Sequence, residues 1–212
     1  MARSSGHAPG WWIALVTALT LLAGILLAPD AWLREQVAAE RASNQAFFAT
    51  RTNERIEDRA LRWFHRAFVK TGLVDRTYSG LLSQPDTRAD PSAEMSGRFN
   101  AWAAARADAL WVLVMLVVLR LSVAATWLPL LLLVAAGALN DAWVSRKIKT
   151  STFGGTSPHG FHFAQLVVRY VPPVILYLFI APFHLPASIP PLLILLMGVA
   201  AWVAISQFAK RA

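Results

Sequence analysis

The chain has 212 residues, 56% of them hydrophobic, and a formal net charge of +8. Globular domains are about 45–50% apolar even when glycine is counted, so this composition excludes a disordered chain and argues against an ordinary soluble domain. Because the chain has no cysteine, disulfide frameworks, cysteine-based zinc sites and thiol nucleophiles are also excluded. A charge of +8 would point to nucleic acid in a soluble protein, but in a membrane protein such a surplus records orientation.

The apolar residues are concentrated in four continuous runs. These runs cover residues 11–28, 110–139, 166–183 and 189–208. A helix of about 20 apolar residues crosses the roughly 30 Å of bilayer hydrocarbon, and a continuous run without alternation is typical of a helix. We therefore predict an all-α, polytopic helical membrane protein with four transmembrane helices.

The first run, residues 11–28, follows a cytoplasmic N-terminus at residues 1–10 that carries Arg3. A cleaved signal peptide is the alternative, since a basic residue precedes the run. The run is longer than a usual signal core, however, and Pro29 directly follows the one small residue suited to cleavage. We predict an uncleaved membrane anchor.

Residues 29–109 are expected to form a helical extracytoplasmic segment. The sequence predicts helix from Pro29 to about Lys70, followed by a polar loop at residues 83–97 that returns the chain to the membrane. The segment has 12 basic and 11 acidic residues, so its net charge is only +1. Binding to phosphate needs uncompensated positive charge, and direct contact with nucleic acid is therefore not expected.

An apolar stripe runs along the predicted helix and ends in three aromatic residues, Trp63, Phe64 and Phe68. Spacing of three and four residues places such side chains on one helix face. The stripe can pack on its own chain, or it can serve as a partner surface or lie on the bilayer. The sequence leaves these alternatives open.

The second run, residues 110–139, contains no turn signal and is predicted to be one helix with a kink at Pro129. Arg120 lies inside this run, and a charge within a span is a functional candidate by default. Alternatively, the span is 121–139, with Arg120 at the outer headgroups and residues 110–119 in an outer extension. We favour this second reading because a side chain near a helix end reaches the interface easily.

Residues 140–165 are predicted to be a cytoplasmic basic loop. The helix of the second run continues past Asp141 and then breaks near Gly154 and Gly155. Candidate contacts with a partner or with lipid in this region include an acidic residue, three basic residues, the glycine break and two residues of the following helix. They are Asp141, Arg146, Lys147, Lys149, Phe153, Gly154, Gly155, His162 and Arg169.

The basic residues of this loop are most often only a topology signal, although they can also attract anionic lipid or an acidic partner. His159 and His162 are three residues apart, but a metal site needs three or four ligands, and no carboxylate follows residue 141. We therefore expect no metal and no cofactor.

The third run, 166–183, is weakened by Pro172 and Pro173, which are expected to confine the good helix to the residues after them. A short outer loop at 184–188 leads to the fourth run, and residues 209–212 form a cytoplasmic C-terminus. This topology places the basic ends inside, as the positive-inside rule requires, in a multi-pass protein of the bacterial inner membrane.

The loop and its flanking helices resemble the membrane-protein family of integrating conjugative elements. The resemblance is carried by Gly137, Asp141, Arg146, the break at 153–155 and His162, together with RWFHRAFVKTG (62–72) and LYLFIAP (176–182). It implies a role in a conjugative transfer apparatus, a type IV secretion system with its coupling ATPase. It implies no catalytic residue.

The resulting hypothesis is a non-catalytic component of a conjugative DNA-transfer assembly. Its expected partners are membrane lipids and other conjugation proteins, including the coupling ATPase, whereas its oligomeric state is open. The alternative is a small transporter or channel-like protein in which Arg120 and Asp141 line a polar path.

Overall fold

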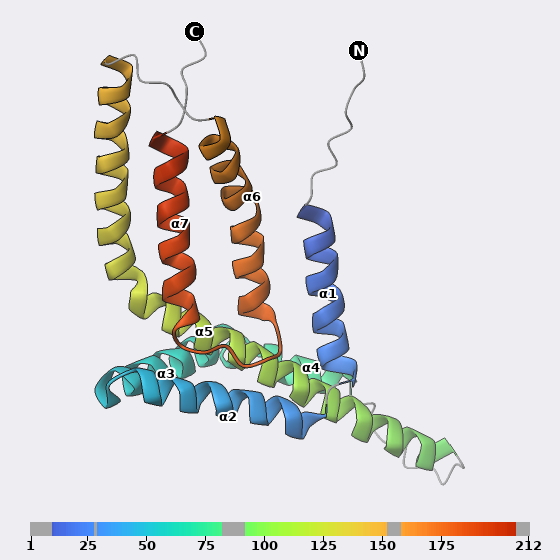
Figure 1. The fold of residues 1–212 in the computed structure, drawn as a ribbon. Helices are drawn as coiled ribbons and strands as arrows, with labels where there is room; N and C mark the ends of the chain where they lie inside the picture. Colours follow the sequence, from blue (N-terminus) through green and yellow to red (C-terminus); the bar gives the residue numbers. More distant parts are fainter. Residues whose placement is uncertain (1–9, 28, 82–91, 152–157, 207–212) are drawn as a thin grey trace, which may run out of the picture. The chain divides into compact units, whose positions relative to one another are not determined.

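The computed structural model describes residues 10–27, 29–81, 92–151 and 158–206. Within these residues every regular element is helical, which confirms the predicted all-α class (Figure 1). The elements are α1 (Gly10–Leu27), α2 (Asp30–Phe47), α3 (Thr50–Phe64), the π-helix η1 (His65–Val69), α4 (Leu73–Leu81), α5 (Ser92–Ser151), α6 (Pro158–Ile180) and α7 (Ile189–Ser206).

The chain divides into two compact units. One unit, here named the core unit, comprises residues 14–123 and 179–187. The other unit, named the apolar unit, comprises residues 1–13, 124–178 and 188–212. Helix α5 therefore contributes its first part to the core unit and its second part to the apolar unit.

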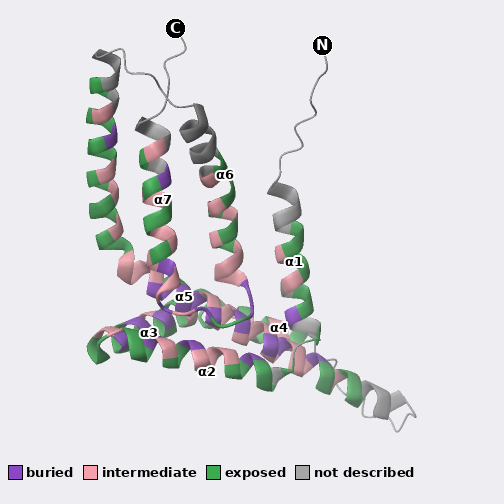
Figure 2. Ribbon diagram, viewed as in Figure 1, coloured by how far each residue is buried: buried purple, intermediate pink, exposed green. Residues whose placement is uncertain are grey.

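The core unit is built on α2, α3 and the first part of α5. Helix α2 buries Leu33, and α3 buries Ile56 and Ala60. The α5 residues Ala109 and Leu113 form a cluster with Leu33. Each large aliphatic side chain buried in this way contributes about 1.5–3 kcal/mol. Figure 2 shows these buried positions in purple along α2, α3 and the first part of α5.

The helix expected from Pro29 to Lys70 is not continuous, and this part of the prediction is wrong. Helix α2 ends where the backbone of Phe48 becomes extended, with φ −98° and ψ 147°, and α3 begins again at Thr50. The break allows both helices to contribute buried residues to the same core. After α3 the helix widens into the π-helix η1, in which the Lys70 N–H donates to the carbonyl of His65, five residues earlier, at 2.8 Å.

Within the core unit, α1 approaches α5 and the segment after α6 closely at Gly24. A Cβ atom at this position would lie 3.3 Å from Cγ of Pro182 and 3.8 Å from Cδ1 of Leu113. The first of these distances is shorter than an ordinary van der Waals contact, and the second is an ordinary one. The absence of a side chain at Gly24 therefore allows α1 to lie this close to Pro182. The outward side of α1 leaves Leu15, Leu19 and Leu22 exposed.

Among the described helices, one segment is long and apolar enough to cross a membrane, residues Gly97–Ser145 of α5. Shorter apolar segments lie at Leu15–Gly24, Arg169–Ile180 and Ile189–Ala200. The second predicted run is thus part of one helix that contains Pro129 and continues to Ser151.

The apolar unit consists of the second part of α5 with most of α6 and α7. Large apolar side chains on all three helices are exposed, among them Leu133, Leu176 and Leu192. Exposed positions are green in Figure 2. Helix α6 runs through Pro172 and Pro173 without interruption, so the expectation that they confine the helix is wrong. Each proline removes one backbone donor, and the turns on either side keep the helix.

Candidate functional site

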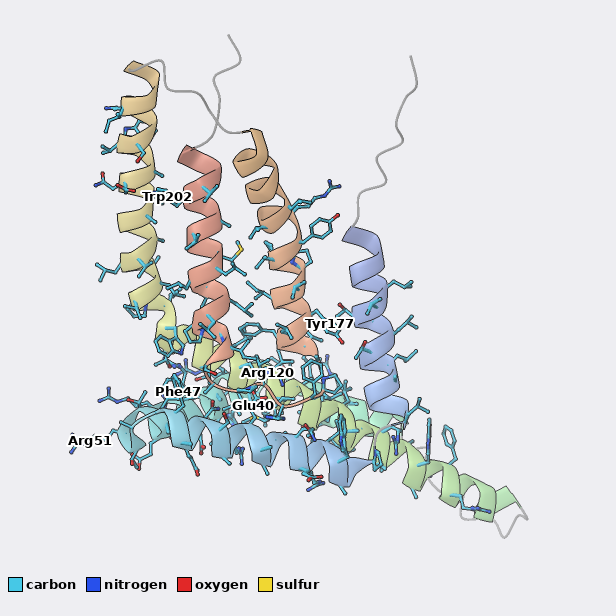
Figure 3. All side chains as sticks on the ribbon, viewed as in Figure 1. Glu40, Phe47, Arg51, Arg120, Tyr177 and Trp202 are labelled. Carbon is cyan, nitrogen blue, oxygen red and sulfur yellow. The ribbon has the colours of Figure 1, made fainter. Side chains whose placement is uncertain are left out.

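The most unusual group in the core unit is the buried ion pair between Arg120 of α5 and Glu40 of α2. Both side chains are only 2% exposed, and Nη2 of Arg120 lies 2.7 Å from Oε2 of Glu40. Nε of Arg120 lies 3.0 Å from each carboxylate oxygen. Figure 3 shows the two side chains meeting next to the connection between α6 and α7. A buried charge is stable only when it is paired and hydrogen-bonded, and this one is both.

Arg120 also holds the backbone that follows α6. Its Nη1 donates to the carbonyl of Ala181 at 2.7 Å and to that of Phe179 at 3.2 Å. Its Nη2 donates to the carbonyl of Phe183. All three guanidinium nitrogens therefore donate within the core unit, and the planar fork of arginine is suited to such divergent contacts.

The same loop is held from its other side by one face of α2. The backbone N–H of His184 donates to Oε1 of Gln36 at 3.0 Å, and that of Leu185 donates to Oε2 of Glu40 at 3.1 Å. The N–H of Ala187 donates to Oγ of Ser43 at 3.2 Å. Positions 36, 40 and 43 follow helical spacing, so one polar face of α2 accepts successive donors of the loop.

A second polar cluster joins α3 to α5 through Ser122, which is fully buried. Arg59 donates from Nε to Oγ of Ser122 at 2.9 Å and from Nη2 to the Ser122 carbonyl at 2.6 Å. The Ser122 hydroxyl donates in turn to the carbonyl of Ile56 at 2.7 Å. Burial, followed by the nearby positive charge of Arg62, lowers the pKa of Arg59 from its ordinary value.

The aromatic residues at the end of the predicted stripe have different environments. The rings of Phe64 and Phe68 lie 5.9 Å and 5.6 Å from the ring of Trp111 on α5, in edge-to-face geometry. Trp63 is 37% exposed, with the guanidinium carbon of Arg59 5.7 Å from its ring centre. Phe64 and Phe68 therefore pack on the chain itself, while Trp63 faces outward.

Helix α4 is tied to α5 by Tyr78, whose hydroxyl donates to the carboxylate of Asp108. This hydrogen bond, followed by burial and the negative charge of Asp108, raises the pKa of Tyr78 to about 12. The neutral phenol is thus the form that the folded protein favours. Because the pKa is raised in the folded state, the stabilisation is complete below the ordinary pKa of 10 and is lost as the pH rises through about 12.

Replacing Tyr78 with phenylalanine should remove an ionisation with a midpoint near pH 12 from the ultraviolet absorbance titration of the full-length protein. Asp108→Asn should move this midpoint toward the ordinary tyrosine value, because the carboxylate is the main cause of the shift. Tyr170→Phe, on exposed α6, serves as the matched control and should leave the component in place. An unchanged midpoint in Asp108→Asn would contradict this assignment.

The acidic candidate of the predicted inner region, Asp141, lies in the apolar unit. Its Oδ2 accepts a hydrogen bond from Nε1 of Trp202 at 2.6 Å, which joins α5 to α7. Figure 3 labels Trp202 on α7. A charged acceptor strengthens such a bond. Trp202 is a partner that sequence reasoning did not identify, because the two residues meet only through tertiary structure.

The other inner candidates are only partly described. Lys147 is exposed, with Nζ 5.9 Å from the centre of the Trp143 ring, and Arg169 on α6 is also exposed. The remaining candidates either lie on helices without a described side chain, as for Arg146, Lys149 and His162, or fall outside the described residues, as for Phe153, Gly154 and Gly155. No group of three potential metal ligands occurs among the residues that the structure describes.

Sequence reasoning identified Arg120 but missed Glu40, Gln36 and Ser43 as its surroundings. The available signal was the position of Glu40, which shares a helix face with Leu33 seven residues earlier. An acidic residue in line with a buried leucine indicates a carboxylate that needs a buried cation. Arg120 is the one basic residue of the second apolar run, and it could therefore have been predicted as the cation that pairs with Glu40.

Residues 21–209 match the model of a family described as IncC plasmid conjugative DNA transfer protein DtrJ-like. The chain belongs to the DtrJ-like family. Searches of the curated proteins and of the solved structures found no significant match. The match to the DtrJ-like family confirms the predicted connection with conjugative DNA transfer. The matched family is, however, a different one from the membrane-protein family of integrating conjugative elements that the sequence resembles. The DtrJ-like description names transfer and indicates no catalytic activity.

Proposed function

We propose that this DtrJ-like protein is a non-catalytic, multi-pass component of the conjugative apparatus in the bacterial inner membrane, where it docks partner proteins. Its membership in a conjugative DNA-transfer family supports the process. The helices of the apolar unit support the membrane placement, since their exposed leucines form a surface suited to lipid.

The proposed topology keeps four spans, with the second one at 121–139. Residues of α5 before this point, such as Leu113, Leu116 and Leu119, are at most 3% exposed and lie in the core unit. A segment buried by α2 and α3 is not facing lipid. In this proposal α2, α3 and the first part of α5 lie outside the cytoplasm, whereas α1, the second part of α5, α6 and α7 span the membrane.

The observation that best supports a structural role is the set of contacts made by the buried side chain of Arg120. Its guanidinium is paired with Glu40 and bonded to backbone carbonyls, and the side chain is only 2% exposed. A residue that conducts ions or binds a transported substrate needs access to a water-filled path. This arrangement favours a scaffold over the alternative of a small transporter that uses Arg120 and Asp141.

The proposed docking surface for a cytoplasmic partner is the basic end of α5, with Arg146, Lys147 and Lys149. Lys147 is exposed and Trp143 beside it is 57% exposed, a combination suited to a protein contact. The coupling ATPase of the transfer apparatus is the partner we propose. The exposed Trp63 on α3 is the candidate for contact with envelope components.

Deleting the gene should reduce conjugative transfer to background, and the full-length gene should restore it. A triple charge reversal, Arg146→Glu, Lys147→Glu and Lys149→Glu, should fail to restore transfer and should lose co-purification with the coupling ATPase. The matched control exchanges the same positions conservatively, Arg146→Lys, Lys147→Arg and Lys149→Arg, and should restore both. Normal transfer after deletion, with other transfer proteins at normal levels, would refute the proposed role.

A further inference from the structure

A groove between α2 and α5 in the core unit combines an apolar floor with two cationic side chains. Val37, Val112 and Met115 contribute to the floor, and Arg34 and Arg41 lie along its length on α2. Its volume is about 590 Å³, within the range of sites that hold small ligands. The groove uses none of the side chains that hold Arg120 or the loop after α6.

The two arginines of the groove are available for a ligand. Arg34 and Arg41 are both exposed, and neither forms an ion pair with a described carboxylate. They are separated by two helical turns and lie on the same side of α2. Guanidinium groups match the geometry of phosphate oxygens and can bind them bidentately.

The shape of the groove depends on two small residues of α2, Ala38 and Ala42, which also line it. Val112, by contrast, packs against the cluster of Leu33, Ala109 and Leu113, so the floor is fixed by the core. A ligand therefore meets a preformed apolar channel with positive charge at its rim. This combination fits an amphiphile with an anionic head.

The position of the groove along the chain favours a lipid. The apolar helix α1 ends at Leu27, where the side chain is 79% exposed, and α2 begins at Asp30. Arg34 follows within about 6 Å of helix rise, so its guanidinium is within reach of the headgroups at the end of a membrane-anchored α1.

We infer that the groove of α2 and α5 is a binding site for an anionic phospholipid, with an acyl chain on the apolar floor and its phosphate bound by Arg34 and Arg41. The inference rests on the proposed membrane placement and not on the docking of a transfer partner. Lipid binding is measured on the purified protein and conjugative transfer in cells. A negative result for lipid binding can therefore be distinguished from a negative result for the proposed role in conjugation.

The test is retention of phosphatidylglycerol and phosphatidylcholine by the full-length protein in detergent, measured by native mass spectrometry. We expect wild type to prefer phosphatidylglycerol and the double variant Arg34→Gln with Arg41→Gln to bind it about thirtyfold more weakly, as two lost surface charges imply. Ala38→Leu should reduce binding by filling the groove while keeping the charges. Arg55→Gln with Arg62→Gln, at two exposed positions of α3 outside the groove, is the matched control and should bind like wild type.

Equal retention of the two lipids by wild type, or equal losses in the control and in the groove variant, would overturn the assignment. A photoreactive residue at Gln45, which also lines the groove, gives an independent readout in native membranes. Crosslinks to phospholipid support the site. Crosslinks to a protein in place of lipid would identify the groove as a protein interface and overturn the proposal.

Discussion

Replacing Arg120 with methionine is expected to lower the free energy of unfolding of the core unit by about 3–5 kcal/mol, the effect of removing one partner of a buried ion pair. The substitution leaves the carboxyl group of Glu40, which is only 2% exposed, without its cationic partner. It also removes the donors to the carbonyls of Ala181 and Phe183. Denaturant unfolding of the purified full-length protein in detergent measures the loss.

Two further variants separate the pair from the loop that it holds. Arg120→Met with Glu40→Leu removes both charges and should recover much of the lost stability, because apolar residues can replace a buried pair. Backbone hydrogen exchange at Leu185 should be faster in this double variant than in the wild type, because Glu40→Leu removes the acceptor of the Leu185 N–H. Arg55→Met, at an exposed position of α3, is the control for loss of an arginine. A change below about 1 kcal/mol in Arg120→Met, typical of surface pairs, would contradict the assigned role.

Periodicity and apolar runs were sufficient to predict the helical class, but α5 begins at Ser92, inside the polar loop predicted at 83–97, and α4 was not predicted. The apolar runs at 11–28, 166–183 and 189–208 largely overlap α1, α6 and α7. The break at Phe48 was not predicted, because nothing in the residues there stops a helix locally. It is a tertiary effect, since α3 must turn to place Ile56 and Ala60 in the core.

The environment of Arg120 could be predicted only in part. The sequence places it near the end of an apolar run and so predicts an interfacial position or a functional charge. Its partners lie on α2 and after α6, at sequence separations of 80 and 61 residues for Glu40 and Ala181. Single-sequence patterns carry no information on such contacts, so the pairing becomes visible only once the helices are packed.

These contacts restrict the topology more strongly than the hydropathy pattern does. Gln36 and Glu40 of α2 are hydrogen-bonded to the backbone of His184 and Leu185. Groups that share a hydrogen bond must lie on the same side of any membrane. With α2 outside, the segment after α6 is also outside, so α6 must span the membrane if α5 does.

Single cysteines provide a direct test of this topology because the natural chain contains none. Arg51→Cys on α3 and His184→Cys, both at exposed positions, should react with a membrane-impermeant maleimide in cells whose outer membrane alone is permeabilised. Lys147→Cys, on the predicted cytoplasmic end of α5, should react only after the inner membrane is opened. The cysteine-free protein is the control and should stay unlabelled.

The pattern of cysteine labelling shows which part of the proposed topology, if any, is wrong. Labelling of all three variants from outside would mean that α5 does not span, and the proposed membrane placement would be wrong. Labelling of Arg51→Cys but not of His184→Cys would contradict the hydrogen bonds of α2 with the loop after α6. Labelling of Arg51→Cys and His184→Cys, with Lys147→Cys protected, would place the core unit outside and the basic end of α5 inside, where a coupling ATPase can reach it.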